Sequence, residues 1–234
     1  MKRFDDLMLR RERICGFLWL PVHLVLLPLF LVPVLYLLIG PDKMTDAGAN
    51  VIYYMISFLF VLVALWSFLR EGFDRFVGNL RGAVLAMVVA YALQLVLSLG
   101  LQALMGVFGE LETPNNDAIG ELANLEYNKT FAVAVLMAPI AEEVLFRGVL
   151  FGSLARRHRW LGWVVSVAVF CLYHVWQFAV VEQDWTVLLA AIEYIPLTVA
   201  ITYCYDRTQT IWTTIFFHIF TNSLALAYMV SGAS

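Results

Sequence analysis

The chain has 234 residues, of which 62% are hydrophobic and 14% charged, whereas a soluble domain is about 45–50% apolar and about 25% charged. The mean hydropathy of +0.81 argues against a water-soluble domain. The formal net charge of -3 gives no reason to expect a nucleic-acid partner. The apolar residues lie in runs long enough to cross a bilayer. We therefore predict an all-α, polytopic bundle of transmembrane helices.

Apolar runs of about 20 residues define the predicted spans. There are seven, covering residues 14–39, 51–69, 82–108, 130–155, 160–181, 186–205 and 211–231. Pro21, Pro28 and Pro33 are expected to kink the first span, because proline lacks a backbone donor. The polar stretch from Glu110 to Asn128 predicts a long outer loop. The chain then divides into residues 1–129, with three helices and this loop, and a core of residues 130–234.

Basic residues gather at one set of predicted helix ends. They are Lys2, Arg3, Arg10, Arg11, Arg13, Arg70, Arg75, Arg81, Arg156, Arg157, Arg159 and Arg207. The opposite loops hold Lys43 and Lys129 among the acidic residues Asp42, Asp46, Glu110, Glu112, Asp117, Glu121, Glu126, Glu182 and Asp184. The positive-inside rule therefore predicts a cytoplasmic amino terminus and an outer carboxy terminus. An integral protein of a prokaryotic plasma membrane is expected.

Three ionisable residues interrupt the fourth predicted span, within APIAEEVLFRGVLFG. A charged residue at the centre of a membrane helix costs about 2.5–3.5 kcal/mol, so such groups are paired or hydrated. Glu143 and Arg147 are four residues apart and share a helical face, which predicts an ion pair. Glu142 points about 100° away from Glu143. It is therefore not the natural partner of Arg147 and is available for chemistry.

Two further polar pairs lie in apolar spans. Phe170 and His174 form one i,i+4 pair, and His218 and Asn222 form another. Either histidine alone is explained by a hydrogen bond between two helices. Together with Glu142, two imidazoles and a carboxamide can bind water, move a proton and stabilise an oxyanion.

These motifs, EEVLFR, FxxxH and HxxxN in this order, resemble the CAAX prenyl protease and bacteriocin-processing family of intramembrane endopeptidases. The resemblance extends over about residues 130 to 225 and includes the stretch YDRTQTIWTTIFFHIFTN, where Gln209 stands in place of the usual glycine. It implies a glutamate-dependent protease whose internal cavity is open toward the cytosolic leaflet. Glu142 would be the general base and His174 would bind the attacking water. His218 and Asn222 would stabilise the oxyanion, while Glu143 and Arg147 complete the first motif.

Several alternatives remain at this point. A carboxylate and two histidines can hold zinc, so a zinc-dependent protease using the same residues competes with a cofactor-free enzyme, although no HExxH motif is present. A non-catalytic membrane protein that binds a partner is a second alternative. A proton-coupled transporter is a third, disfavoured because we see no internal repeat.

Other polar residues in or near the spans can be explained by a structural role as well as by a functional one. Glu193 stays outside the catalytic set, because it can bond the backbone freed by Pro196. Gln177 is placed to orient His174, while His23 and His158 are interpreted as interfacial. The expected partners are the bilayer and a membrane-associated protein or peptide substrate. The sequence predicts no oligomeric state.

Overall fold

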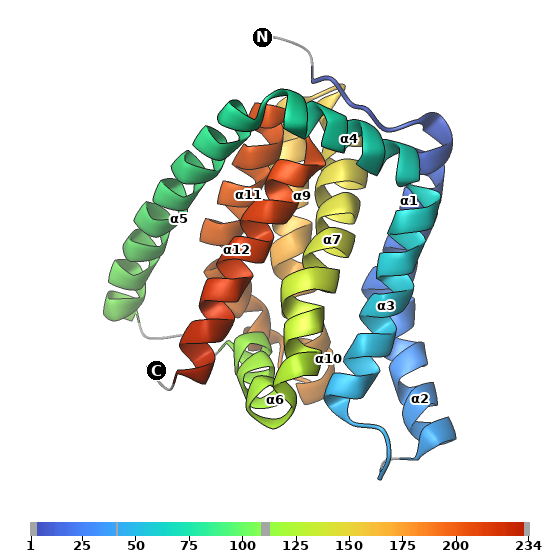
Figure 1. Ribbon diagram of the computed structural model, residues 1–234. Helices are drawn as coiled ribbons and strands as arrows, with labels where there is room; N and C mark the ends of the chain where they lie inside the picture. The colour runs from blue at the N-terminus through green and yellow to red at the C-terminus, as the bar shows by residue number, and fades with distance from the viewer. Residues whose placement is uncertain (1–3, 41, 109–112, 232–234) are drawn as a thin grey trace.

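The computed structural model describes residues 4–40, 42–108 and 113–231. The described chain is helical almost throughout, and its long helices run side by side as a bundle (Figure 1). The elements in chain order are α1 (Arg10–Pro21), η1 (Val22–Leu31), α2 (Val32–Ile39), α3 (Asp46–Ala64), α4 (Trp66–Gly78), α5 (Leu80–Phe108), α6 (Pro114–Phe131), η2 (Ala132–Met137), α7 (Ala138–Glu142), η3 (Glu143–Phe151), α8 (Gly152–Ala155), α9 (Arg159–Tyr173), α10 (Trp176–Glu182), η4 (Trp185–Tyr194), α11 (Ile195–Thr208) and α12 (Ile211–Val230). The predicted all-α membrane bundle is confirmed.

Within the described residues, 6 helices are long and apolar enough to cross a membrane. They are Arg10–Ile39, Asp46–Ala64, Leu80–Val107, Arg159–Glu182, Trp185–Thr208 and Ile211–Val230. The remaining predicted span, residues 130–155, is also helical along its length. It contains Glu142, Glu143 and Arg147, and its stretch from Glu143 to Phe151 is buried inside the bundle instead of facing lipid.

The prolines of the first span coincide with a change in helix type. Pro21 ends α1, and Pro28 lies inside η1, which is a π-helical stretch that leads into α2. Because each proline removes one donor from the helical ladder, a locally widened turn accommodates it. The span continues from Arg10 to Ile39 as one helical run.

The second predicted span is wrong at its carboxy-terminal boundary. The helix α3 begins after Thr45, whose side chain accepts a hydrogen bond from the Gly48 amide, and ends at Ala64. Leu65 then leaves the helical conformation, and residues 66–78 form the separate helix α4, which crosses the top of the bundle in Figure 1. Charged residues alternate with apolar ones in α4, so one side buries Phe68 and Phe76 and the other stays exposed.

The predicted loop from Glu110 to Asn128 is also largely wrong. Helix α6 begins at Pro114, where a missing backbone donor is tolerated, and runs through most of this segment. It packs on α3, α12 and η2 at the bottom of the bundle in Figure 1. Four charged positions used in the charge pattern, Lys2, Arg3, Glu110 and Glu112, lie outside the described residues.

The other end of the bundle carries exposed arginines, and we call it the arginine-rich end: Arg10, Arg11, Arg70, Arg81, Arg156, Arg157 and Arg207. Ion pairs join its segments, since Arg75 binds Asp5 and Arg159 binds Asp206. Beneath it lies an apolar cluster that includes Phe68, Leu145, Phe151, Tyr205 and Ile215. Because this cluster contains residues from both predicted halves, the amino-terminal helices share a core with residues 130–234.

Candidate active site

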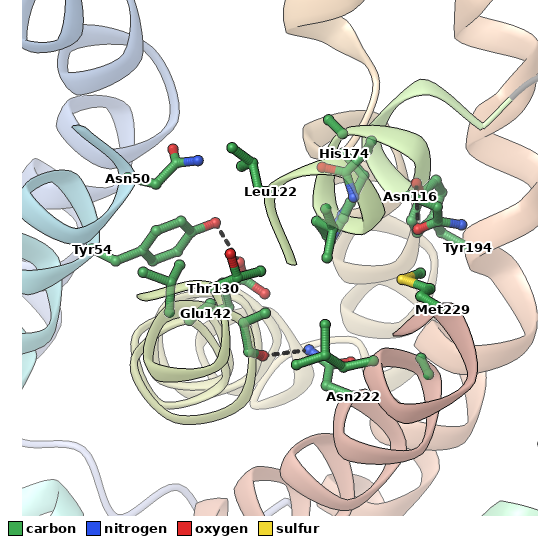
Figure 2. Close-up of a pocket in the computed structure, with 18 of the residues that line it drawn as sticks. Asn50, Tyr54, Asn116, Leu122, Thr130, Glu142, His174, Tyr194, Asn222 and Met229 are labelled. Atoms are coloured by element: carbon green, nitrogen blue, oxygen red, sulfur yellow. Dashed lines mark hydrogen bonds between the residues drawn. The ribbon is translucent and has the colours of Figure 1, made fainter. Parts of the chain in front are cut away.

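One cavity brings together all four predicted catalytic residues. It has a volume of about 410 Å³, and Glu142, His174, His218 and Asn222 all line it. This volume is within the usual range for a small-molecule or peptide site. Figure 2 shows Glu142, His174 and Asn222 approaching the cavity from different helices, with the Tyr54 hydroxyl bonded to the Glu142 carboxylate.

The ion pair between Glu143 and Arg147 forms as predicted. Arg147 Nη1 lies 3.2 Å from Glu143 Oε1, and both side chains are fully buried. Arg147 Nη2 also donates to the Thr198 carbonyl at 3.4 Å, and its guanidinium lies 4.1 Å from the centre of the Phe170 ring. The first residue of the FxxxH motif therefore supports a buried cation, which is stabilised by the face of an aromatic ring.

Glu142 lies apart from this pair, as the helical geometry predicts. Its Oε1 accepts a hydrogen bond from the Tyr54 hydroxyl at 3.0 Å, while Glu143 Oε1 contacts Arg147 and His218. Glu142 is the last residue of α7 and the π-helical η3 begins directly after it. Such wide turns are rare and occur often at functional sites. Only Glu142 of the two glutamates lines the cavity.

The hydrogen bonds of the two histidines determine which ring nitrogen is available. His174 Nδ1 lies 2.9 Å from the Phe170 carbonyl oxygen. That oxygen can only accept, so Nδ1 carries a proton and the neutral ring keeps Nε2 as an acceptor. His218 Nδ1 lies 2.8 Å from Glu143 Oε1. When Glu143 is ionised, Nδ1 of His218 donates, and Nε2 donates as well only if the ring carries both protons.

Asn222 also bonds to the backbone of η2, a contact that its i,i+4 spacing from His218 does not predict. Its Nδ2 donates to the Ala134 carbonyl at 2.8 Å, as Figure 2 shows. This bond uses one of two amide hydrogens and fixes the carboxamide at the edge of the cavity. The second hydrogen and the oxygen of the carboxamide are available to a bound molecule.

The main feature that the sequence analysis missed is a network of buried hydroxyls behind Glu142. Tyr54 OH lies 3.0 Å from Tyr173 OH, which lies 3.2 Å from His23 Nε2, and His23 Nδ1 lies 2.8 Å from Ser57 Oγ. His23 is fully buried, so the interfacial interpretation is wrong. Tyrosine hydroxyls in an apolar span need partners, which was the available signal in Tyr53-Tyr54.

Three other polar residues were singled out from the sequence, namely Gln177, Glu193 and His158. Gln177 and Glu193 line the same cavity as the four predicted residues. His158 is exposed near Arg157, in agreement with its interfacial interpretation. Within the described residues, no three His, Cys, Asp or Glu side chains form a group that could hold a metal ion.

The segment that carries the motifs is similar to a known protein family. The family model described as "Type II CAAX prenyl endopeptidase Rce1-like" matches residues 126–224. No curated protein and no solved structure matches the chain. The matched segment begins in α6 and ends in α12, so it contains every residue predicted for catalysis.

Proposed function

Residues 126–224 belong to the Rce1-like family of type II CAAX prenyl endopeptidases, and from this membership we propose that Glu142 activates water for peptide-bond hydrolysis inside the bundle. The observation that carries the proposal is the convergence of Glu142, His174, His218 and Asn222 on one cavity. A membrane-associated protein or peptide is the proposed substrate.

The first step assigns a role to Glu142 and His174. A water molecule donates one hydrogen bond to the Glu142 carboxylate and the other to His174 Nε2, which the Phe170 contact leaves as an acceptor. Glu142 takes the first proton while the water oxygen bonds to the carbonyl carbon of the scissile peptide. General-base help of this kind contributes about 10²- to 10⁴-fold.

The second step assigns the oxyanion to Asn222 and His218. As the carbon–oxygen bond forms, the carbonyl electron pair moves to its oxygen, where the free Asn222 amide hydrogen and His218 Nε2–H donate to it. His218 donates from both nitrogens in this role, and the adjacent Glu143 carboxylate compensates the ring charge. One such donor contributes about 10²- to 10³-fold. The intermediate then collapses, and the leaving amine takes the proton from Glu142.

The zinc-dependent alternative uses the same residues and is separated from this proposal by metal analysis. A scaffold without catalysis is disfavoured by the chemistry gathered in the cavity. Buried ionisable groups inside a membrane protein are costly, and a binding role does not require a carboxylate, two imidazoles and a carboxamide around one cavity.

The test compares protein termini in membranes that contain the wild type, Glu142→Gln or Glu193→Gln. Glu193 provides a matched control, because it places a second carboxylate in the same cavity. We expect mass spectrometry to find peptide termini that depend on the wild type and persist with Glu193→Gln, but fall at least 10²-fold with Glu142→Gln. Equal termini from all three proteins would refute the proposal.

A further inference from the structure

We propose that the cavity opens away from the cytoplasm and that its substrate is an extracytoplasmic segment of an exported or membrane-anchored polypeptide. This inference rests on the proposed peptidase function, and it names the side and the class of the substrate. It differs from the cytosolic opening that the family resemblance implies.

The cavity lies toward one end of the bundle. Its outer lining comes from α6 and from the ends of helices beside α6, and includes Asn50, Asn115, Asn116, Gln177 and Met229. Tyr194 OH donates to Asn116 Oδ1 at 3.4 Å, so α6 and the η4–α11 junction meet there. Among the described lining residues, none belongs to α4 or to the turns at 156–158 and 209–210. The cavity therefore lies in the half of the bundle next to α6.

Closely packed side chains separate the cavity from the arginine-rich end. Glu143 and Arg147 are fully buried above Glu142. Val149 and Phe151 continue from Arg147 toward that end, and both belong to the apolar cluster that also contains Leu145, Phe68 and Ile215. Polar substrate cannot pass through close-packed apolar side chains. The accessible mouth is on the α6 side.

The two ends of the bundle differ in the charge that they expose. The arginine-rich end carries the exposed arginines defined above, whereas the α6 end carries exposed acidic residues, namely Asp46, Asp117, Glu121, Glu182 and Asp184. Lysine and arginine are enriched in cytoplasmic loops of membrane proteins. The arginine-rich end therefore faces the cytoplasm. The end that carries α6, which lies at the bottom of Figure 1, faces outward together with the cavity mouth.

The chemistry of the lining indicates what enters. Carboxamides such as Asn50, Asn116 and Gln177 both donate and accept hydrogen bonds, as the backbone of an extended peptide requires. Lys129 is the one cation at the outer lining among the described residues, and it forms an ion pair with Glu126. Glu142 adds negative charge. The cavity therefore suits an internal, neutral or basic segment better than a free terminal carboxylate.

Cysteine labelling tests the direction of the mouth without any substrate. In a Cys15→Ser background, where the other cysteines Cys171 and Cys204 are buried, Asp117→Cys marks the α6 end and Arg157→Cys marks the arginine-rich end. Both positions are exposed, so both variants should fold. A membrane-impermeant maleimide added to intact cells should label Asp117→Cys fully, and should label Arg157→Cys only after permeabilisation.

The reverse labelling pattern would overturn the proposal, because the mouth would then face the cytoplasm. The class of substrate is tested by mapping the termini lost in cells with Glu142→Gln. We expect them in extracytoplasmic segments, and termini in cytoplasmic or lipidated carboxy-terminal segments would overturn this part. Outward labelling with no Glu142-dependent termini would instead refute the peptidase function and leave the direction of the mouth intact.

Discussion

At the scale of single residues, the two neighbouring glutamates Glu142 and Glu143 have different surroundings. A variant of one should lose activity, and a variant of the other should lose stability. Glu143→Gln leaves Arg147 without its counter-ion at a fully buried site, where breaking an ion pair costs about 3–5 kcal/mol. We expect a lower midpoint of thermal unfolding in detergent. Glu142→Gln should unfold like the wild type, because it removes no partner from Arg147.

The double variant Glu143→Gln with Arg147→Met is the control for this prediction. It removes both charges, so part of the lost stability should return. Activity should not return, because His218 then lacks the carboxylate that its Nδ1 contacts. If Glu142→Gln unfolded the protein while Glu143→Gln left it stable and inactive, the two roles would be exchanged.

Tyr54 is a positioning residue for the proposed base, because its hydroxyl donates to Glu142 Oε1. This bond holds the carboxylate in place, and misplacing a catalytic group can cost about 10²-fold in rate, so Tyr54→Phe should slow cleavage by about 10- to 100-fold. The ionised carboxylate loses more than the protonated one. The acid limb of the pH–rate profile should therefore move to higher pH.

Tyr53→Phe is the matched control for Tyr54→Phe. Tyr53 donates to the His23 carbonyl at 3.1 Å and contacts Tyr173, with no bond to Glu142. Both variants keep the other ionisable groups around Glu142, which are His174, His218, Glu143 and Arg147. Equal pH–rate profiles for the two variants would show that Tyr54 has only a structural role.

The contacts of His174 and His218 also lead to a prediction about metal binding. Both Nδ1 atoms have protein partners, so each ring offers one remaining nitrogen. We expect cleavage to survive stringent chelation and purified protein to contain no stoichiometric zinc. A single tightly bound zinc ion that is lost with His174→Ala or His218→Ala would establish the metalloprotease alternative, because losing one ligand collapses the affinity of a three-ligand site.

At the scale of elements, α1 is joined to η3 through a close backbone approach. A methyl group added at Gly16 would overlap Cγ2 of Val149. Gly16→Ala should therefore push α1 away from η3 and lower the free energy of unfolding by about 1–3 kcal/mol, as measured by thermal unfolding in detergent.

Gly100→Ala in α5 is the control for this packing effect, because nothing lies within 4 Å of the added methyl group. It should leave stability unchanged or raise it by up to about 1 kcal/mol, the helix-propensity difference. Equal losses from Gly16→Ala and Gly100→Ala would mean that contact with Val149 is not the cause.

The elements also show which parts of the fold were predictable. The length of the apolar runs was sufficient to find the spans, because the thickness of the bilayer sets the length of a transmembrane helix. The boundary at Ala64 and helix α6 were not found, since α4 and α6 are polar helices whose burial depends on contacts with other segments. The i,i+4 pairs of the site were predictable from spacing alone. The contacts of Tyr54 with Glu142 and of His218 with Glu143 join separate helices, so no local pattern carries them.

At the scale of the whole molecule, α1 begins and α12 ends at opposite ends of the bundle in Figure 1, as an odd number of crossings requires. In the proposed orientation, with the arginine-rich end in the cytoplasm, alkaline phosphatase fused after Ser234 should be active. The same enzyme fused after Arg157 is the control and should be inactive. A well-expressed but inactive fusion at Ser234 would remove the seven-span arrangement.

The apolar cluster beneath the arginine-rich end includes Phe68, Phe151, Tyr205 and Ile215. It also bears on whether ions can leak across the membrane through the protein. A water-filled cavity halfway through a membrane would leak ions if they could continue from it to the other face of the membrane. We expect the cluster to block ions between the cavity and the arginine-rich end, because close-packed apolar side chains exclude charged species. Abundant expression of the protein should therefore leave the transmembrane voltage undiminished.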